Sequence, residues 1–248
     1  MNREEYEVMY QVEDRHWWYL GMERITRGLL DRAIGRNAPL RILDAGCGTG
    51  AVMGYLNDYG AVTGFDFAVE ALRFCRQRGR DQLTQASVLK MPYVDSAFDL
   101  VVSFDVICQR DVEDEQALLE LARVLKPGGR LLLRLPAYNW LRGKHDQATH
   151  VTHRYTRREI KSKLSRAGFT AERLSYANTF LFPIAALKRL SEPFFTKQQN
   201  GSDLTLNPGS MNGIFRAILG AEAPLVRSIG LPFGLTVVAL ARKPCNAH

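Results

Sequence analysis

Short apolar runs alternate with longer amphipathic stretches along the first half of the chain. The apolar run 40–43 ends in an aspartate, closely spaced glycines follow, and an amphipathic stretch covers 51–59, which predicts a strand, a tight turn and a helix. The alternation continues with strands predicted at 61–65, 99–104 and 130–135, and helices predicted at 68–78 and 114–125. Lys126-Pro127-Gly128-Gly129 ends the last helix, because proline cannot continue a helix and glycine supplies the turn.

The second half of the chain has a basic helix predicted at 157–167 and ended by Gly168, and strands predicted near 171–176 and 235–242. Between those strands lie two apolar helical stretches, 180–190 and 214–229, separated by a polar loop at 198–210. Strands that alternate with helices of this length predict an α/β fold. We therefore expect a doubly wound, Rossmann-like, mostly parallel seven-stranded sheet with a helical insert before the last strand.

The size and composition fit one large α/β domain. With 248 residues, 46% of them hydrophobic, the chain can bury a full core. Its four cysteines stand far apart without CxxC spacing, which argues against a zinc site and a disulfide framework and fits a reducing compartment. The polar N-terminal segment lacks the apolar core of a secretory signal, and no apolar stretch is long and unbroken enough to span a bilayer. We therefore expect a cytoplasmic protein.

The net charge of +7 is unevenly distributed. Residues 1–136 hold 17 lysines and arginines against 20 aspartates and glutamates, whereas residues 137–248 hold 16 against 6. A surface that attracts a nucleic acid, an anionic membrane or a phosphorylated small molecule is therefore expected in the second half. Because the apolar insert lies in the same half, weak peripheral membrane contact is one hypothesis. The sequence does not indicate an oligomeric state.

The segment Asp44-Ala45-Gly46-Cys47-Gly48-Thr49-Gly50 predicts a ligand-binding turn. Glycine has no Cβ, so the main chain can approach a ligand closely, and the following helix presents unpaired N–H groups. Asp66 stands about 20 positions later, at the end of the next predicted strand, where an acidic side chain can accept hydrogen bonds from ribose hydroxyls. Dinucleotide dehydrogenases use a similar turn, but they space its glycines as G-x-G-x-x-G, whereas Gly46, Gly48 and Gly50 stand at alternate positions.

Four further motifs accompany this turn, and they read Gly64-Phe65-Asp66, Ala86-Ser87-Val88-Leu89-Lys90-Met91-Pro92, Ser96-Ala97-Phe98-Asp99-Leu100-Val101-Val102 and Leu125-Lys126-Pro127-Gly128-Gly129-Arg130-Leu131. Over about residues 38–136 the chain resembles the class I S-adenosylmethionine-dependent methyltransferases, and among them the small-molecule enzymes similar to ubiquinone and menaquinone methyltransferases. The resemblance implies S-adenosylmethionine as the cofactor. It also implies a methyltransferase domain over 37–248, preceded by an N-terminal helical lid over 1–36 and elaborated by a cap or substrate insert at about 178–232.

The resemblance further implies which residues hold the cofactor. The expected contacts are Asp44, Gly46, Cys47 and Gly48 with the methionine moiety, Asp66 with the ribose, Phe67, Ser87 and Val88 with the adenine, and Ser103 and Phe104 with the sulfonium. Many relatives carry an acidic residue where Ser87 stands, so the contact to the adenine amino group can instead run through the main chain. Asp66 is also placed to cap the following helix, and Cys47 is expected to be a small filler of the turn rather than a nucleophile.

The N-terminal segment is unusually aromatic, with Trp17 and Trp18 side by side. In related enzymes an N-terminal helix closes over the cofactor. By this resemblance Trp17 or Trp18 is predicted to cover the site, and Arg24 to reach the cofactor carboxylate. The alternative is a helix that packs on the edge of the sheet.

The candidate catalytic residues follow the predicted strand 130–135, and they are Tyr138, His145, His150 and His153. A sulfonium is already a strong electrophile, so the protein needs mainly to align the acceptor and exclude water, and it needs a base only when the nucleophile arrives protonated. Any one of the histidines can serve as that base, orient the acceptor or have a structural role. No metal is expected, because no carboxylate cluster completes a site around them.

The run 153–159 resembles methyltransferases of glycan and lipid-linked pathways, so a small-molecule acceptor that is hydrophobic, glycan-linked or lipid-linked is the main expectation. A nucleic-acid or protein methyltransferase is the first alternative. Nucleic acid is disfavoured, because Ser103-Phe104-Asp105-Val106 departs from the Asn/Asp-Pro-Pro-Tyr motif of amino-methylating DNA enzymes and no RNA-binding module is evident. The second alternative is a noncatalytic nucleotide-cofactor-binding protein, which calorimetry with S-adenosylmethionine and NAD would distinguish.

Overall fold

A sheet of seven strands forms the centre of the computed structural model, which describes residues 1–35, 39–191 and 209–245. The strands are β1 Leu40–Ala45, β2 Gly60–Asp66, β3 Leu83–Gln85, β4 Phe98–Phe104, β5 Leu125–Pro136, β6 Thr170–Ala177 and β7 Thr236–Arg242. Their order across the sheet is β3-β2-β1-β4-β5-β7-β6. Strands β1 to β5 run parallel, and β7 pairs antiparallel with both β5 and β6. The predicted doubly wound, mostly parallel, Rossmann-like sheet is confirmed.

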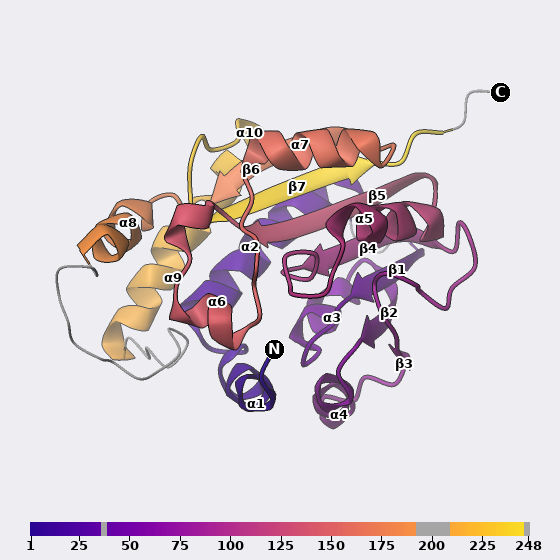
Figure 1. The fold of residues 1–248 in the computed structure, drawn as a ribbon, viewed down its shortest axis with the longest axis horizontal. Coiled ribbons are helices and arrows are strands. Elements are labelled where there is room, and N and C mark those ends of the chain that lie inside the picture. The colour runs from indigo at the N-terminus through magenta and orange to yellow at the C-terminus, as the bar shows by residue number, and fades with distance from the viewer. Residues whose placement is uncertain (36–38, 192–208, 246–248) are drawn as a thin grey trace.

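Helices cover both faces of this sheet (Figure 1). They are α1 Arg3–Val12, α2 Trp17–Ala33, α3 Ala51–Leu56, α4 Val69–Gln77, α5 Asp114–Val124, α6 Lys144–Ala148, α7 Arg157–Arg166, α8 Phe182–Ser191, α9 Asn212–Ala221 and α10 Ala223–Ser228. Short 3-10 helices span Asn139–Leu141 and Gly209–Met211. Within the described residues, no helix combines the length and the apolar character that crossing a membrane requires.

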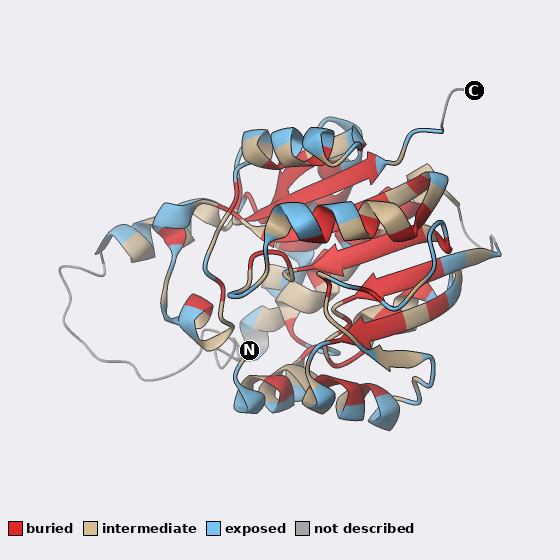
Figure 2. Ribbon diagram, turned by 45° about the vertical axis from the view of Figure 1, so that its right-hand side comes forward, coloured by how far each residue is buried: buried red, intermediate tan, exposed pale blue. Residues whose placement is uncertain are grey.

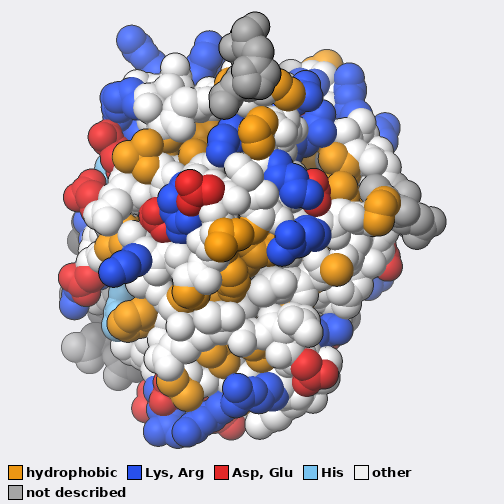
Figure 3. Space-filling model, turned by 90° about the vertical axis from the view of Figure 1, so that its right-hand side faces the viewer, with side chains coloured by type: hydrophobic (Ala, Val, Ile, Leu, Met, Phe, Trp, Pro, Cys, Tyr) orange, Lys and Arg blue, Asp and Glu red, His pale blue; other side chains and the backbone are white. Residues whose placement is uncertain are grey.

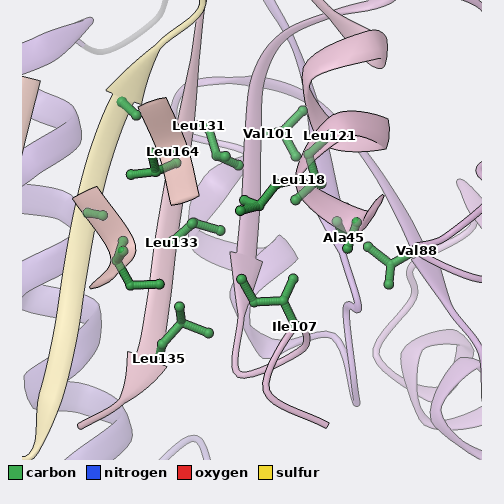
Figure 4. Close-up of a cluster of buried hydrophobic side chains, with 14 of the residues drawn as sticks. Ala45, Val88, Val101, Ile107, Leu118, Leu121, Leu131, Leu133, Leu135 and Leu164 are labelled. Carbon is green, nitrogen blue, oxygen red and sulfur yellow. The ribbon is translucent and has the colours of Figure 1, made fainter. Parts of the chain in front are cut away.

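The central strands β1, β4 and β5 and the neighbouring β7 are largely apolar, because both of their faces are mostly buried (Figure 2). On one face, Leu131 and Leu133 of β5 join Leu118 of α5 and Leu164 of α7 in one hydrophobic cluster (Figure 4). The intervening Leu132 belongs to the cluster on the opposite face. Successive side chains of a strand alternate between faces, so a continuous apolar run serves two cores at once.

Helix α2 is part of the second cluster. Its residues Met22 and Ile25 are buried together with Leu132 of β5, Leu219 of α9 and Val226 of α10. Helices α9 and α10, which form the second half of the predicted insert, therefore pack on α2, and α2 covers the sheet. Most of α2 is thus a core helix rather than a separate cover. The lid function of residues 1–36 stays a prediction.

Several element boundaries differ from the predictions. Strand β5 begins at Leu125 rather than at 130, because Leu125 pairs with Phe98 across a register irregularity, so the predicted proline-glycine turn lies inside the strand. The predicted helix 214–229 is divided at Glu222 into α9 and α10. Strand β3 is three residues long, too short for an apolar run to predict it. The predicted loop 198–210 lies almost entirely outside the described residues.

The carboxyl ends of β1, β2, β4 and β5 meet at one edge of the sheet. The chain crosses from β1 to β2 on one side of β1, and β4 lies on the other side, which makes this edge the switch point where open α/β sheets bind ligands. The topology therefore predicts a ligand site at the carboxyl ends of β1 and β4. On the different face that Figure 3 shows, lysine, arginine and acidic side chains are interspersed with small apolar patches.

Candidate active site

A cavity of about 1330 Å³ lies at this edge of the sheet. Its wall includes the glycine-rich turn after β1, Asp66 at the end of β2, the pair Ser87-Val88 and Phe104 at the end of β4. Residues of α1, α2, α6 and α8 complete the wall. Ordinary small-molecule pockets measure roughly 300–1,000 Å³, so this cavity has room for two small ligands.

The glycine-rich turn has a conformation that requires glycine. Gly46 has φ +82°, and a Cβ built on it would lie 2.3 Å from Cγ2 of Val106. Gly48 has φ +53°, and a Cβ there would lie 3.0 Å from the side chain of Met9. The backbone nitrogens of Gly46 and Cys47 both donate to the carbonyl oxygen of Phe65, at 2.9 and 2.8 Å. The turn is thus fixed against β2 and leaves its main chain close to the cavity.

Asp44 ends the apolar part of β1 and reaches the cavity wall. Its residue is only 1% exposed, and its Oδ2 atom has no hydrogen-bond partner among the described residues. Burial raises the pKa of Asp44 to about 7, and the nearby charge of Asp66 adds to the increase. A buried carboxylate oxygen without a partner is costly, so this position favours a ligand that brings a hydrogen-bond donor or a positive charge.

Asp66 connects the turn to the beginning of α4. Its Oδ2 accepts a 3.0 Å hydrogen bond from the backbone nitrogen of Gly48, and its Oδ1 accepts one of 2.9 Å from that of Ala68. The prediction that Asp66 caps α4 is wrong, because the N-cap is Ala68 and it has no side-chain cap hydrogen bond; Asp66 instead bonds to the residue before the helix and lies in the cavity wall. Burial raises the pKa of Asp66. Because each carboxylate oxygen can accept two hydrogen bonds, Asp66 retains capacity for donors on a ligand.

The residues predicted to contact an adenine also line the cavity. Phe67 is 76% exposed at the rim, and Ser87 and Val88 stand beside it in the wall. The hydroxyl of Ser87 accepts a 3.2 Å hydrogen bond from the backbone nitrogen of Leu89. Ser87 therefore stabilises its own turn, and its carbonyl oxygen also accepts a 3.1 Å hydrogen bond from the backbone nitrogen of Lys90.

Cys47 lies in the cavity wall as a small buried side chain. Its Sγ atom is 3.7 Å from Sγ of Cys75 on α4, and Cys75 in turn donates to the carbonyl oxygen of Gly48 at 3.1 Å. The contact with Cys75, and secondly burial, raise the pKa of the Cys47 thiol. These contacts fit the predicted filler role and disfavour a nucleophilic thiolate.

The N-terminal helices approach the cavity closely. Trp17 and Trp18, at the beginning of α2, both line it. Glu13, which follows α1, is buried, accepts a hydrogen bond from the hydroxyl of Thr49 in the turn, and pairs with Nη2 of Arg78 at 2.9 Å. Sequence reasoning missed Glu13, because a glutamate in a charged segment resembles an ordinary surface residue.

Two predicted cofactor residues lie away from the cavity wall. Arg24 packs against α9, where a Cβ built on Gly220 would lie 3.1 Å from its side chain. Ser103 is 1% exposed and does not line the cavity. The strand tip instead presents Phe104, Asp105 and, from β5, Arg134. Sequence reasoning missed Arg134, although a single arginine within the apolar segment 131–135 was a usable signal.

The predicted catalytic residues fall into two groups. His145 and His150 line the cavity. His150 contacts the N-terminal segment, with Nδ1 at 3.1 Å from the amino group of Met1 and Nε2 at 2.9 Å from Oδ1 of Asn2. His153 lies outside the cavity wall and pairs through Nε2 with Glu159 at 2.7 Å.

Tyr138 is also outside the cavity wall. Its ring stacks on Tyr176 with centroids 5.2 Å apart, and contacts Phe182 of α8 edge-on at 5.8 Å. Burial raises the pKa of its hydroxyl, which disfavours Tyr138 as a proton acceptor. Within the described ranges, no three His, Cys, Asp or Glu side chains are grouped as metal ligands.

Comparisons with known proteins give this geometry a family context. Residues 43–133 match a family model described as a methyltransferase domain. A demethylmenaquinone methyltransferase from Tropheryma whipplei is 34% identical over 134 residues, which cover 51% of this chain and 50% of that protein. A malonyl-[acyl-carrier protein] O-methyltransferase from Pseudescherichia vulneris is 36% identical over 110 residues, 44% of this chain and 43% of that protein.

The chain spans about half the length of these curated relatives. A solved S-adenosylmethionine-dependent methyltransferase from Thermotoga maritima superposes with a TM-score of 0.59 at 16% identity, covering 97% of this chain and 95% of that one. This likeness extends the shared fold beyond the matched domain to almost the whole chain. The sequence motifs, the matched domain over residues 43–133 and the topology together support a class I S-adenosylmethionine-dependent methyltransferase.

Proposed function

We propose that the chain transfers a methyl group from S-adenosylmethionine to a small-molecule acceptor held in the same cavity. One observation carries this proposal: the glycine-rich turn, the unpartnered oxygen of Asp44 and the carboxylate of Asp66 line one cavity that has room for a second ligand. Bound S-adenosylmethionine supplies an electrophilic methyl group on a sulfonium sulfur. The protein's own part is therefore to bind, orient and exclude water.

The residues of the cavity fit this cofactor from end to end. Asp44 offers a buried oxygen that lacks a donor, and the turn from Gly46 to Gly48 has no Cβ between its main chain and a ligand. Asp66 can accept further hydrogen bonds from ribose hydroxyls. Phe67 and the Ser87-Val88 backbone supply an apolar rim and an edge for a base.

On the acceptor side, His145 and His150 are the side chains that we propose for orienting the nucleophile, because both line the cavity. Accepting a proton on His150 would require it to release Met1 or Asn2, which hold its two ring nitrogens. Tyr138 and His153 would act indirectly, since they lie outside the cavity wall. Tyr138 does so through its stacking on Tyr176, and His153 through its pair with Glu159.

We further propose that the acceptor has an apolar part. The cavity extends to Val106, Leu141 and Ala185 of α8, which are side chains that favour hydrocarbon over charge. Outside the cavity, α8 exposes Ile184 and Leu187 by 67% and 70%, which supports weak contact with a membrane surface. One relative acts, by its name, on demethylmenaquinone, and an apolar acceptor for this chain accords with that.

The proposal is tested by ligand binding and by product identification. Calorimetry is expected to detect binding of S-adenosylhomocysteine and no binding of NAD at the same concentration. Incubation with methyl-labelled S-adenosylmethionine and a metabolite extract is expected to label a small molecule that mass spectrometry identifies. Binding of NAD without S-adenosylhomocysteine, or label recovered only in protein or nucleic acid, would contradict the proposal.

A further inference from the structure

Arg134 is a buried cation in a central strand. Its neighbours Leu133 and Leu135 belong to the core cluster between the sheet and α5, and Arg134 points to the opposite face. The residue is 9% exposed, yet it lines the cavity. Burying a guanidinium costs several kcal/mol unless it has partners, so its contacts indicate why it stands there.

Three side chains hold the guanidinium in place. Its Nε atom donates a 3.0 Å hydrogen bond to Oδ2 of Asp105. Its central carbon lies 4.4 Å from the ring centroid of Phe104 and 4.8 Å from that of Trp18, within the range of cation–π contacts. Nη1 and Nη2 make no hydrogen bond within residues 1–35, 39–191 and 209–245. The group is thus fixed by one nitrogen and two rings, and it keeps two nitrogens for a ligand.

Asp44 lies on the same face of the sheet as Arg134. Asp44 pairs in register with Val102 of β4, and Phe104, two residues further along β4, pairs with Arg134 of β5. Strand β4 therefore separates the two charges. Arg134 lowers the pKa of Asp44 against the larger effect of burial, so the charges are close enough to interact. The ion pair that Arg134 makes in the described part of the chain is with Asp105.

Asp44 and Arg134 are a buried anion and a buried cation that face one cavity and do not pair with each other. This arrangement matches a ligand that carries both charges close together. An α-amino-acid group has an ammonium and a carboxylate on one carbon. The ammonium fits Oδ2 of Asp44, which lacks a partner, and the carboxylate fits the planar fork of a guanidinium. Asp44 also begins the glycine-rich turn, which places this pair beside the proposed methionine end of the cofactor.

We propose that Arg134, held by Trp18, Phe104 and Asp105, binds the carboxylate at the methionine end of the cofactor. The assignment rests on the proposed function, because it assumes that S-adenosylmethionine occupies the cavity. It gives Arg134 the role predicted for Arg24, whose side chain packs against α9. It also gives Trp18 a role as a positioning residue for Arg134 rather than as a simple cover.

The test compares two probes that differ at the amino-acid end. S-adenosylhomocysteine carries the amino-acid group, and 5′-methylthioadenosine lacks it. Calorimetry on the full chain is expected to show that Arg134→Met weakens binding of S-adenosylhomocysteine about 10- to 100-fold, while binding of 5′-methylthioadenosine changes less than about twofold. Arg130→Met is the matched control, because Arg130 is also on β5 but pairs with Glu172 at 2.7 Å, away from the cavity.

Four outcomes would overturn the assignment. Equal loss of both probes would make Arg134 a general support of the site, and unchanged binding of S-adenosylhomocysteine would remove its contact with the cofactor. If Arg134→Met unfolds the chain, Arg134→Lys replaces it, because lysine keeps the charge and loses the planar fork. Arg134→Lys is expected to weaken binding of S-adenosylhomocysteine only. Equal effects on the binding of both probes would again contradict the assignment. A native chain that binds neither probe would overturn the proposed cofactor and this assignment with it.

Discussion

The backbone nitrogen of Gly48 donates a 3.0 Å hydrogen bond to Oδ2 of Asp66. This bond joins the turn after β1 to the end of β2, two segments that the sequence separates by a helix. It means that one carboxylate both shapes the glycine-rich turn and faces the cavity. A substitution at Asp66 therefore disturbs the methionine and ribose portions of the proposed site together.

Asp66→Ala is expected to weaken binding of S-adenosylhomocysteine by about 10- to 100-fold, because it removes a charged acceptor worth about 1.5–3 kcal/mol per hydrogen bond. Asp66→Asn keeps one acceptor oxygen and is expected to lose less. Calorimetry measures both. Asp81→Ala is the control, since Asp81 is exposed and outside the cavity wall. Equal affinities for the two alanine variants would contradict a ribose-binding role for Asp66.

Gly46→Ala tests whether the turn needs glycine for steric reasons. The added Cβ would lie 2.3 Å from Cγ2 of Val106, at a φ of +82°. Strain of this kind costs about 1–3 kcal/mol, so urea unfolding is expected to show a loss of that size. The double variant Gly46→Ala/Val106→Ala is expected to recover the steric part, because it removes the clashing methyl group.

Gly28→Ala is the control for this loss, because Gly28 lies inside α2 and a Cβ there meets nothing within 4 Å. Alanine is favoured over glycine in a helix by up to about 1 kcal/mol. Gly28→Ala is therefore expected to leave stability unchanged or raise it. A Gly46→Ala variant as stable as Gly28→Ala would refute the steric argument.

The fold was predictable because its signals are local. A parallel sheet buried on both faces produces continuous apolar strands, and the turn from Asp44 to Gly50 is written in consecutive residues. Asp44 and Asp66 stand at strand ends, so counting along the chain was enough to place both in the site.

The rest of the site depends on register and on helix faces, which counting does not reveal. Arg134 reaches Phe104 because β5 pairs with β4 in one particular register. Arg24 was predicted to reach the cofactor, but α2 turns that residue toward Gly220, a contact between segments far apart in the sequence. Tyr138, with φ +60°, points into an aromatic cluster that no periodicity predicts.

Helix α8 is expected to bind anionic vesicles at low ionic strength. Ile184 and Leu187 on this helix have exposed apolar side chains. The acidic residue in the described part of the insert, Glu222, is fully buried. The insert can therefore make apolar contacts with an anionic surface without being repelled by it. Flotation with phosphatidylglycerol vesicles is expected to carry the chain upward. Phosphatidylcholine vesicles or high salt are expected to weaken this, because they remove or screen the attraction between an anionic surface and the basic second half of the chain.

Leu187→Glu is expected to reduce this flotation strongly, because it places a negative charge within the apolar stripe of α8. Leu119→Glu on α5 is the matched control, since Leu119 is 56% exposed on a different helix. Equal flotation of both variants, or failure of the native chain to float with anionic vesicles, would argue against α8 as a membrane contact.

The pKa of about 7 at Asp44 predicts how stability and binding change with pH. In the unfolded chain an aspartate has a pKa of about 3.9, so the folded chain without ligand holds more protons between about pH 4 and pH 7. Stability therefore falls as pH rises through that window. Asp44→Asn removes this group, and urea unfolding is expected to show a shallower fall of stability with pH for the variant than for the native chain.

The affinity for the ligand has the opposite dependence on pH, because an ammonium group on the ligand requires ionised Asp44. The affinity for S-adenosylhomocysteine is expected to rise between about pH 6 and pH 8 in the native chain and to stay flat in Asp44→Asn; parallel curves would mean that Asp44 does not face the ammonium group.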